Sequence, residues 1–155
     1  MTARPNGLPW PPIIYLAAIA ASVLLNLFYP LPWFGQALSG ILFVLGWLMI
    51  AAFVALNVSG IRAMRRAGTT VRPDRGTDHL VTDGPFSLTR NPLDVAGAML
   101  VLGIGLVSGI AWFLLLALLA AFTVQKLAIE REERHLQARF GETYLDYVRR
   151  VRRWI

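Results

Sequence analysis

The 155-residue sequence contains no cysteine and only two histidines. Without cysteine, the chain can form neither a disulfide framework nor a cysteine-ligated zinc or iron–sulfur site. Two histidines are too few for a multi-histidine metal site, so we expect no metal partner. Charge is also missing over long stretches, because no Asp, Glu, Lys or Arg occurs from Pro5 to Ile61 or from Val95 to Gln125.

The uncharged stretches are long and apolar enough to cross a lipid bilayer, which takes about 20 apolar residues per helix. The first stretch divides at the segment YPLPWFG, and the second divides near Ser108-Gly109. We therefore expect four spans, at about residues 13–29, 34–58, 93–107 and 110–124. The expected fold is all-α, a single integral-membrane domain that covers residues 1–155.

The charged residues predict how the spans are oriented. All 15 Lys and Arg residues fall in the N-terminus, in the loop Arg62–Arg90 or in the tail Lys126–Arg153, whereas the two short connections carry no charge. With four spans, these three segments share one face, and the positive-inside rule makes that face cytoplasmic. We expect a multi-pass protein of a bacterial inner membrane with both termini in the cytoplasm. Because the arginines follow the membrane face and no recognition motif occurs, we expect no nucleic-acid partner.

The cytoplasmic loop and the tail have distinct patterns. Ile61–Ala67 is expected to extend the second span, and Gly68–Gly76 to form an irregular connector. Asn91-Pro92 predicts a helix start, since Asn is a favoured N-cap and Pro suits the first helical position. Asp94 stands where an acid can bond back to the cap. The tail predicts one or two amphipathic helices, broken at Gly141, on the cytoplasmic leaflet.

Several segments of the second half occur in a telling order. They are TTVRPDRGTDHLVTDGPFSLTRNP, the triplet Gly103-Ile104-Gly105, EREERHL and FGETYLDYVRRVRRWI. Together they cover about residues 68–155, and this ordered set resembles the integral-membrane methyltransferases typified by isoprenylcysteine carboxyl methyltransferase. Phosphatidylethanolamine N-methyltransferases are more distant members of that family.

The resemblance can be followed residue by residue. The family pattern is Arg-His-Pro-x-Tyr-x-Gly, a hydrophobic hairpin and then a Glu-Glu pair. Arg90, Pro92 and the pair Glu132-Glu133 match this pattern. The departures from it are Asn91 at the His position, Asp94 at the Tyr position and Ala96 at the Gly position. They leave open which acceptor is methylated.

The resemblance implies methyl transfer from S-adenosylmethionine (SAM) to a lipophilic or lipidated acceptor dissolved in the bilayer. Carboxyl O-methylation of an isoprenylcysteine-type substrate is the closest analogy. SAM would lie between the third and fourth spans and the C-terminal helix. The implied cofactor-binding residues are Arg90, Asn91, Pro92, Gly103, Gly105, Glu132, Glu133, Tyr144 and Tyr147. The implied catalytic residues are Arg90, Glu133 and Asp94.

The same residue types suit the chemistry of SAM, which carries a carboxylate, an amine, a sulfonium and an adenine ring. Arg90 beside a helix start favours an anion. Glu132 or Glu133 can pair with the amine, and Tyr144 or Tyr147 can cover a ring. A carboxylate acceptor needs no general base, whereas an amine or thiol would need one, for which Asp94 or Glu133 is the candidate.

Each of these roles has a structural alternative. Arg90 can pair with Asp94 or with lipid headgroups, and Gly103 and Gly105 can serve close helix packing. The acidic pair can be a solvated helix face, the tyrosines can be core contacts, and His79 and His135 suit the membrane interface. Two other classes of protein also stay open. One is an NADPH-dependent membrane reductase of the sterol-reductase type, and the other is a non-enzymatic adaptor whose basic tail binds anionic lipid.

Overall fold

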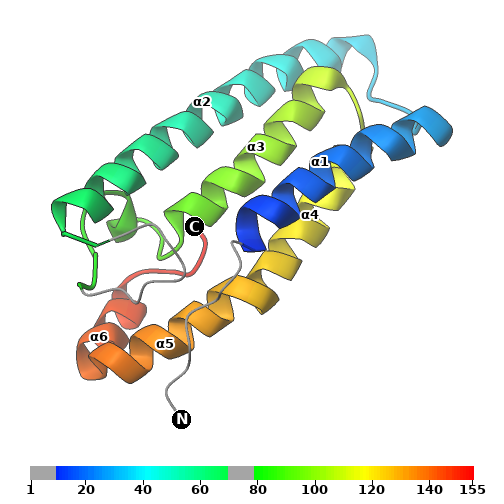
Figure 1. Ribbon diagram of the computed structural model, residues 1–155. Helices are drawn as coiled ribbons and strands as arrows, with labels where there is room; N and C mark the ends of the chain where they lie inside the picture. Colours follow the sequence, from blue (N-terminus) through cyan, green and yellow to red (C-terminus); the bar gives the residue numbers. More distant parts are fainter. Residues whose placement is uncertain (1–9, 70–78) are drawn as a thin grey trace.

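The computed structural model describes residues 10–69 and 79–155. Most of the expected connector Gly68–Gly76 therefore lies outside the described residues, as does Arg4. The described residues form helices and no strand, which confirms the all-α class (Figure 1). In chain order the helices are α1 (Trp10–Phe28), α2 (Gln36–Arg66), the 3₁₀ turn η1 (Gly84–Ser87), α3 (Pro92–Ser108), α4 (Trp112–Val124), the π-helical turn η2 (Gln125–Ile129), α5 (Glu130–Phe140) and α6 (Glu142–Arg150).

The described helices are those of a membrane protein. Three of them are long and apolar enough to cross a bilayer, namely Trp10–Phe28, Gln36–Arg66 and the continuous helix Trp112–Phe140. The fourth expected span is the shorter apolar helix α3. Large apolar side chains such as Leu27, Phe43 and Phe122 are exposed on the outside of the bundle. A helix can expose such side chains to lipid because its backbone hydrogen bonds are already satisfied.

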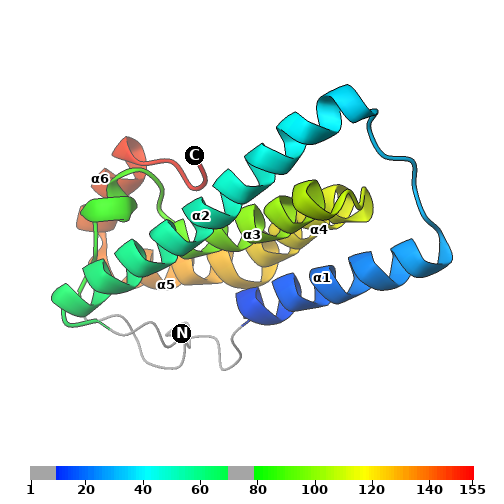
Figure 2. The same cartoon turned by 90° about the horizontal axis from the view of Figure 1, so that it is seen from above.

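The helices pack in pairs along their lengths. α2 packs along α3 and α1 packs along α4, while α3 also contacts α4 and α1 (Figures 1 and 2). Buried side chains of α1, α3, α4 and η2 meet in one hydrophobic core, which includes Tyr15, Val101, Phe113, Val124 and Ile129. The core ties the first helix to the second half of the chain.

Close backbone approach explains the tight contact between α2 and α3. Gly46 of α2 lies against Gly103 of α3, and a Cβ at Gly103 would stand 2.9 Å from the carbonyl oxygen of Gly46. A Cβ at Gly46 would stand 2.8 Å from the carbonyl oxygen of Gly103. Small residues at such a crossing let helices approach closely in a membrane, where packing rather than water exclusion drives association.

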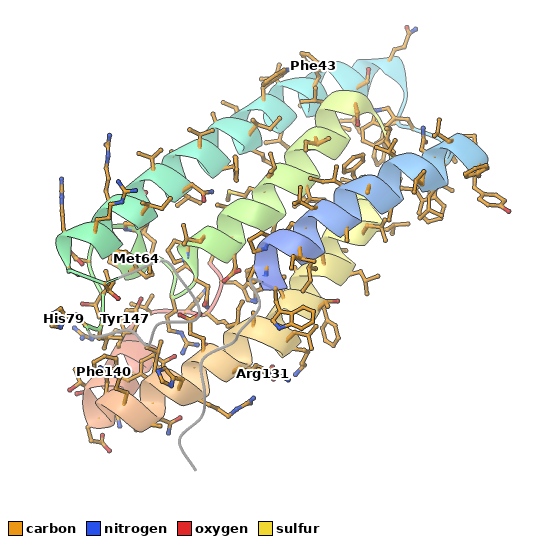
Figure 3. The ribbon with its side chains drawn as sticks, in the orientation of Figure 1. Phe43, Met64, His79, Arg131, Phe140 and Tyr147 are labelled. Atoms are coloured by element: carbon orange, nitrogen blue, oxygen red, sulfur yellow. The ribbon has the colours of Figure 1, made fainter. Side chains whose placement is uncertain are left out.

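Two helices reach beyond the membrane at the same end of the molecule. α2 has 31 residues, which gives about 46 Å at about 1.5 Å per residue, against a bilayer core of about 30 Å. Its last turns carry Arg62, Arg65 and Arg66, as the sequence predicted. At the other side of the bundle, α4 continues through η2 into the polar helix α5. Met64 of α2 and Tyr147 of α6 lie near one another at this end, whereas Phe43 lies at the opposite end of α2 (Figure 3).

Candidate functional site

The candidate site begins at the N-terminus of α3. Asn91 and Pro92 occupy the N-cap and first helical positions, as predicted, but no side-chain cap hydrogen bond forms. Asp94 therefore does not bond back to the cap. Instead, Thr89 Oγ1 accepts a hydrogen bond from the Asn91 backbone N–H at 3.2 Å. The Asn91 side chain is thereby available for a contact elsewhere.

That contact is with the C-terminal segment, residues 151–155, which folds back against residues 89–91. The Asn91 amide Nδ2 and the Thr89 hydroxyl each donate to the carbonyl oxygen of Arg153 at 3.0 Å. The Arg90 backbone N–H donates to the carbonyl oxygen of Arg152 at 2.9 Å. One residue further on, the Trp154 indole N–H donates to Gln125 Oε1 of η2 at 2.8 Å. The C-terminal segment is thus held by residues 89–91 and by η2.

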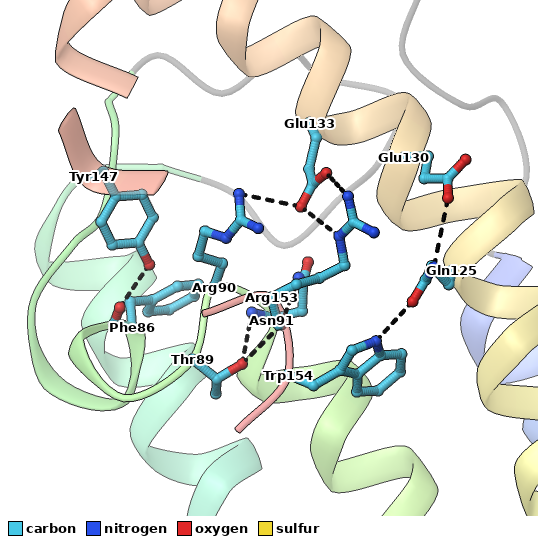
Figure 4. A network of polar contacts seen from close by, with 10 residues as sticks. All are labelled: Phe86, Thr89, Arg90, Asn91, Gln125, Glu130, Glu133, Tyr147, Arg153 and Trp154. Carbon is cyan, nitrogen blue, oxygen red and sulfur yellow. Dashed lines mark hydrogen bonds and ion pairs between the residues drawn. The ribbon is translucent and has the colours of Figure 1, made fainter. Parts of the chain in front are cut away.

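Glu133 of α5 lies where these segments converge (Figure 4). Arg153 donates to both of its carboxylate oxygens, from Nε to Oε1 at 3.0 Å and from Nη2 to Oε2 at 2.7 Å. Arg90 Nη1 lies 3.3 Å from Glu133 Oε1. The hydrogen bond to Glu133 raises the pKa of Arg153, so this arginine stays cationic. Two residues predicted as partners of one cofactor, Arg90 and Glu133, are therefore in direct contact.

Two cavities flank this ion cluster and share a wall of Arg90, Glu133 and Tyr144. The first is narrow, about 50 Å³, and is lined by Met64, Thr69, Leu80, Val81, Phe86, Arg90, Asn91, Glu132, Glu133, Leu136, Tyr144 and Tyr147. The second, about 320 Å³, is lined by Arg90, Glu130, Glu133, Arg134, Gln137, Tyr144, Leu145, Val148 and Arg153. Since ligand pockets usually measure about 300–1,000 Å³, we treat both cavities and their shared wall as one candidate site.

The two predicted tyrosines of α6 are buried and face the first cavity. The Tyr147 hydroxyl donates to the carbonyl oxygen of Phe86, which fixes the η1 segment against α6. Burial raises the pKa of the Tyr144 phenol to about 12, and the nearby Glu133 carboxylate adds to the shift. Burial also raises the pKa of Tyr147. Both phenols are therefore neutral near pH 7 and can donate hydrogen bonds.

Two residues that line the first cavity carry buried polar atoms without a hydrogen-bond partner among the described residues. Arg90 Nε and Thr69 Oγ1 are buried and find no hydrogen-bond partner within the described part of the chain. A buried polar group without a partner is costly, and such a group calls for an explanation such as a bound ligand or water. Thr69 was not predicted, and nothing in its local sequence distinguishes it from other loop threonines.

Six of the nine predicted cofactor residues line the first cavity, and three do not. Pro92 is buried against α2 near Gly60. Gly103 meets Gly46 and Ile50 of α2, and Gly105 lies where a Cβ would come within 2.5 Å of Phe113 Cβ. The two glycines thus serve helix packing, the alternative that the sequence left open. The first cavity lies between the end of α2, residues 80–91, α5 and α6. The C-terminal helix α6 therefore contributes to it, as the expected SAM pocket required, whereas α3 and α4 do not line it.

Asp94, a predicted catalytic residue, lines neither cavity. Its carbonyl oxygen accepts a hydrogen bond from the Tyr15 hydroxyl at 2.9 Å, which joins α3 to α1. Arg90 pairs with Glu133 rather than with Asp94, the pairing considered from the sequence. His79 and His135 also lie outside the lining of both cavities. Among the described residues, no group of His, Asp or Glu could hold a metal ion.

Arg153 is the main site residue that sequence reasoning missed. It was counted among the basic residues of the tail, where RRVRR offers four equivalent arginines. Arg153 differs from the other three arginines only because residues 151–155 fold back against Thr89–Asn91 and place its side chain beside Glu133. No periodicity or motif in the sequence signals that return.

The fold and the site define a small helical membrane protein with an arginine–glutamate cluster and flanking cavities at its polar end. The family model for phospholipid methyltransferases matches residues 41–143, two thirds of the chain. The chain therefore belongs to the phospholipid methyltransferase family, within the group of membrane methyltransferases related to isoprenylcysteine carboxyl methyltransferase. No significant match was found among curated proteins or among solved structures. The protein is a membrane methyltransferase for lipid-type substrates, and its family suggests SAM as the methyl donor.

Proposed function

We propose that this protein transfers a methyl group from SAM to a lipophilic acceptor held in the membrane, with an isoprenylcysteine-type carboxylate as the closest analogue. The observation that carries the proposal is the contact between Arg90 and Glu133 at the wall of two cavities. These residues come from the two motifs that the sequence shares with the family, and 42 intervening positions separate them along the chain. The catalytic region would be residues 68–155.

The residues present fit the chemistry of SAM. Arg90 supplies a guanidinium for its carboxylate, and the buried Arg90 Nε and Thr69 Oγ1 supply polar atoms without partners among the described residues. Glu132 supplies a carboxylate for its amine, whereas both oxygens of Glu133 already accept hydrogen bonds from Arg153. Phe86, Leu136 and Tyr144 supply apolar and aromatic surface for the adenine ring. When bound, SAM supplies an electrophilic methyl group on its sulfonium.

The work of the protein would be to orient the reactants and exclude water. Arg90 and Glu133 are well suited to this because neighbouring atoms restrict both side chains, which are only 11% and 16% exposed. Binding both reactants in the reactive orientation removes the entropy cost of bringing them together, which can account for about 7–11 kcal/mol of the activation free energy. The apolar part of the lining favours a state in which sulfonium and acceptor charges cancel. It consists of Met64, Leu80, Val81, Phe86 and Leu136.

The acceptor that best suits this site carries its own negative charge. A carboxylate attacks the methyl group without losing a proton, whereas an ammonium or thiol must first be deprotonated. Of the candidate bases, Glu133 already accepts hydrogen bonds from Arg153 on both oxygens, and Asp94 lines neither cavity. The described site therefore holds charges in place more than it provides a base. We propose a lipid carboxylate as the preferred acceptor.

Two measurements test the proposed function. Purified protein in detergent is titrated with SAM and, separately, with NADPH while its thermal stability is followed, because a true ligand stabilises the folded state. A labelled-methyl assay then screens lipid carboxylates, amines and thiols. We expect stabilisation by SAM, none by NADPH, and label in a lipid carboxylate. Stabilisation by NADPH alone would support the reductase. A function that survives Arg90→Ala and Glu133→Ala but is lost when Arg149–Arg153 is removed would support the adaptor.

Matched variants connect the activity to the site. Arg90→Lys keeps the charge but removes the planar fork of donors, and we expect about a tenfold or greater loss of kcat/KM. Arg149→Lys is the control, since Arg149 is exposed on α6 and lines neither cavity. Equal effects of the two substitutions would show that the cluster is not the site.

A further inference from the structure

The C-terminal segment delivers one specific side chain to the site. Three hydrogen bonds hold its backbone to residues 89–91, and all three end on the carbonyl oxygens of Arg152 and Arg153. Trp154, the next residue, is bonded to Gln125 and packs against the hydrophobic core. Arg153 is thus fixed on both sides along the chain, which sets the position of its guanidinium beside Glu133. Arg152, in contrast, is exposed.

The two arginines share Glu133 unequally. Arg153 makes the forked contact with both carboxylate oxygens, at 3.0 and 2.7 Å, whereas Arg90 approaches only Oε1, at 3.3 Å. A forked arginine–carboxylate pair is the stronger arrangement. The Arg90 guanidinium also shares a hydrogen bond with the Tyr144 side chain. Its buried Nε, however, has no partner within the described residues, so Arg90 keeps a donor for a ligand.

We propose that Arg153 is a positioning residue that occupies Glu133 and thereby keeps Arg90 available for the anionic group of a ligand. Without Arg153, Glu133 and Arg90 are free to close into a forked pair with each other. That pair would use the donors of Arg90 and cancel its charge, so a ligand carboxylate would have to displace Glu133. The inference rests on the proposed function, because it takes the ligand carboxylate to be that of the cofactor.

The experiment compares two probes that differ in that carboxylate. S-adenosylhomocysteine carries the amino-acid end of the cofactor, whereas methylthioadenosine has the adenosine and sulfur but no carboxylate. Binding of each is measured by calorimetry on the full-length protein in detergent. In Arg153→Gln we expect S-adenosylhomocysteine to bind about tenfold more weakly, as for the loss of one charge-assisted contact. Methylthioadenosine should bind Arg153→Gln and the unsubstituted protein within about twofold.

The control is Arg152→Gln, which removes the same charge from the adjacent exposed position and should leave both affinities unchanged. Arg153→Lys keeps the charge but not the fork, so its affinity for S-adenosylhomocysteine should fall between those of Arg153→Gln and the unsubstituted protein. Trp154→Phe loosens the segment at Gln125 while leaving Arg153 in place. It should lower the thermal stability, with a smaller change in affinity than Arg153→Gln.

The possible outcomes separate the two ideas. Equal weakening of both probes in Arg153→Gln, or weakening of neither, overturns the role of Arg153 while the cofactor site stands. If Arg153→Gln does not fold, Arg153→Lys decides, and equal losses for both probes again overturn the role. If the unsubstituted protein binds neither probe, the proposed function itself fails.

Discussion

At the scale of single residues, the polar end of the molecule depends on one carboxylate. Glu133 is the only acid that contacts Arg90 or Arg153 among the ion pairs of the described residues. Its side chain and that of Arg90 are mostly buried. Removing one member of such a cluster leaves charge in a poorly solvated place, which costs more than the pairing itself contributes.

Glu133→Gln is therefore expected to lower the free energy of unfolding by about 1–3 kcal/mol, since two arginines lose their counter-charge. Denaturant titration of both proteins in the same detergent measures this change in the free energy of unfolding. Glu142→Gln is the matched control, because Glu142 is exposed and lies 3.8 Å from an exposed Arg149. Exposed pairs contribute little, and that variant should change stability by less than about 0.5 kcal/mol. A similar small change for Glu133→Gln would show that the cluster is well hydrated.

Tyr144 gives a pH dependence with a definite sign. Burial, with a contribution from Glu133, raises the pKa of its phenol to about 12 in the folded protein, whereas about 10 is usual in an unfolded chain. Between these two values the unfolded chain has lost the proton and the folded chain has kept it. The Tyr144 contribution to stability is thus full below about pH 10 and is lost as the pH rises toward 12.

The check is to compare unfolding of the protein and of Tyr144→Phe across that window. The unsubstituted protein should lose stability more steeply between about pH 10 and 12, because phenylalanine does not titrate. Parallel curves would mean that the Tyr144 phenol ionises equally in both states. Comparing the two proteins removes the contribution of the other buried tyrosines.

At the scale of elements, the site exists because two separate helices extend past the bilayer. α2 ends in basic turns next to η1, and α5 carries the apolar helix α4 onward through a π-helical turn into charged sequence. The C-terminal segment connects the start of α3, at Asn91, to η2, at Gln125. The distance across the site therefore depends on how α2, α3 and α4 pack within the membrane.

The α2–α3 crossing can be tested at one glycine. Gly103→Ala places a Cβ about 2.9 Å from the Gly46 carbonyl oxygen, and backbone cannot yield without moving a helix. We expect a loss of about 1–3 kcal/mol in unfolding free energy, as is usual for overpacking. Gly40→Ala, on α2, is the control. The added methyl group there has open space around it, so the free energy of unfolding should be unchanged or slightly higher.

The same pair of variants distinguishes packing from cofactor binding. If Gly103 serves the helix crossing, affinity for SAM changes only as far as the helices shift. If Gly103 served the cofactor directly, affinity would fall in Gly103→Ala while the unfolding free energy stayed close to that of Gly40→Ala. The second result would contradict the packing assignment.

At the scale of the whole molecule, charge and helix number predict a topology with both termini in the cytoplasm. The basic residues of α2, α5 and α6 lie at the end that carries the site (Figure 1). The α1–α2 connection lies at the opposite end. Because the chain contains no cysteine, single cysteines can report the side on which each end lies.

Gly35→Cys and Glu142→Cys are suitable substitutions because both positions are exposed. Gly35 belongs to the α1–α2 connection and Glu142 begins α6, and these two parts lie at opposite ends of the molecule (Figure 1). In intact bacterial cells, a membrane-impermeant maleimide should label Gly35→Cys but not Glu142→Cys. After permeabilisation, both should react. The reverse labelling pattern would place the site outside the cytoplasm, where SAM is not expected.

Much of the architecture follows from local sequence alone. An uncharged apolar run of about 20 residues crosses a bilayer as a helix, because a helix satisfies its backbone hydrogen bonds within the segment. The start of α3 at Asn91-Pro92, the turn after Ser108 and the break at Gly141 were therefore predictable and are confirmed. The resemblance to the membrane methyltransferases also implied that Arg90, Glu133 and the two tyrosines belong to one site, and all four line the first cavity.

Only the tertiary structure decided which residues share that site. Gly103 and Gly105 lie at close contacts between helices, and the Asp94 carbonyl oxygen accepts a hydrogen bond from Tyr15. Of the four arginines in RRVRR, it is Arg153 that makes the forked contact with Glu133. Periodicity records which side of a helix is apolar, but it does not record what that side meets. The return of the chain end to Thr89–Asn91 is made by hydrogen bonds to backbone carbonyl oxygens. Every residue has a backbone carbonyl oxygen, so the pattern of side chains does not predict which of these oxygens will accept the hydrogen bonds.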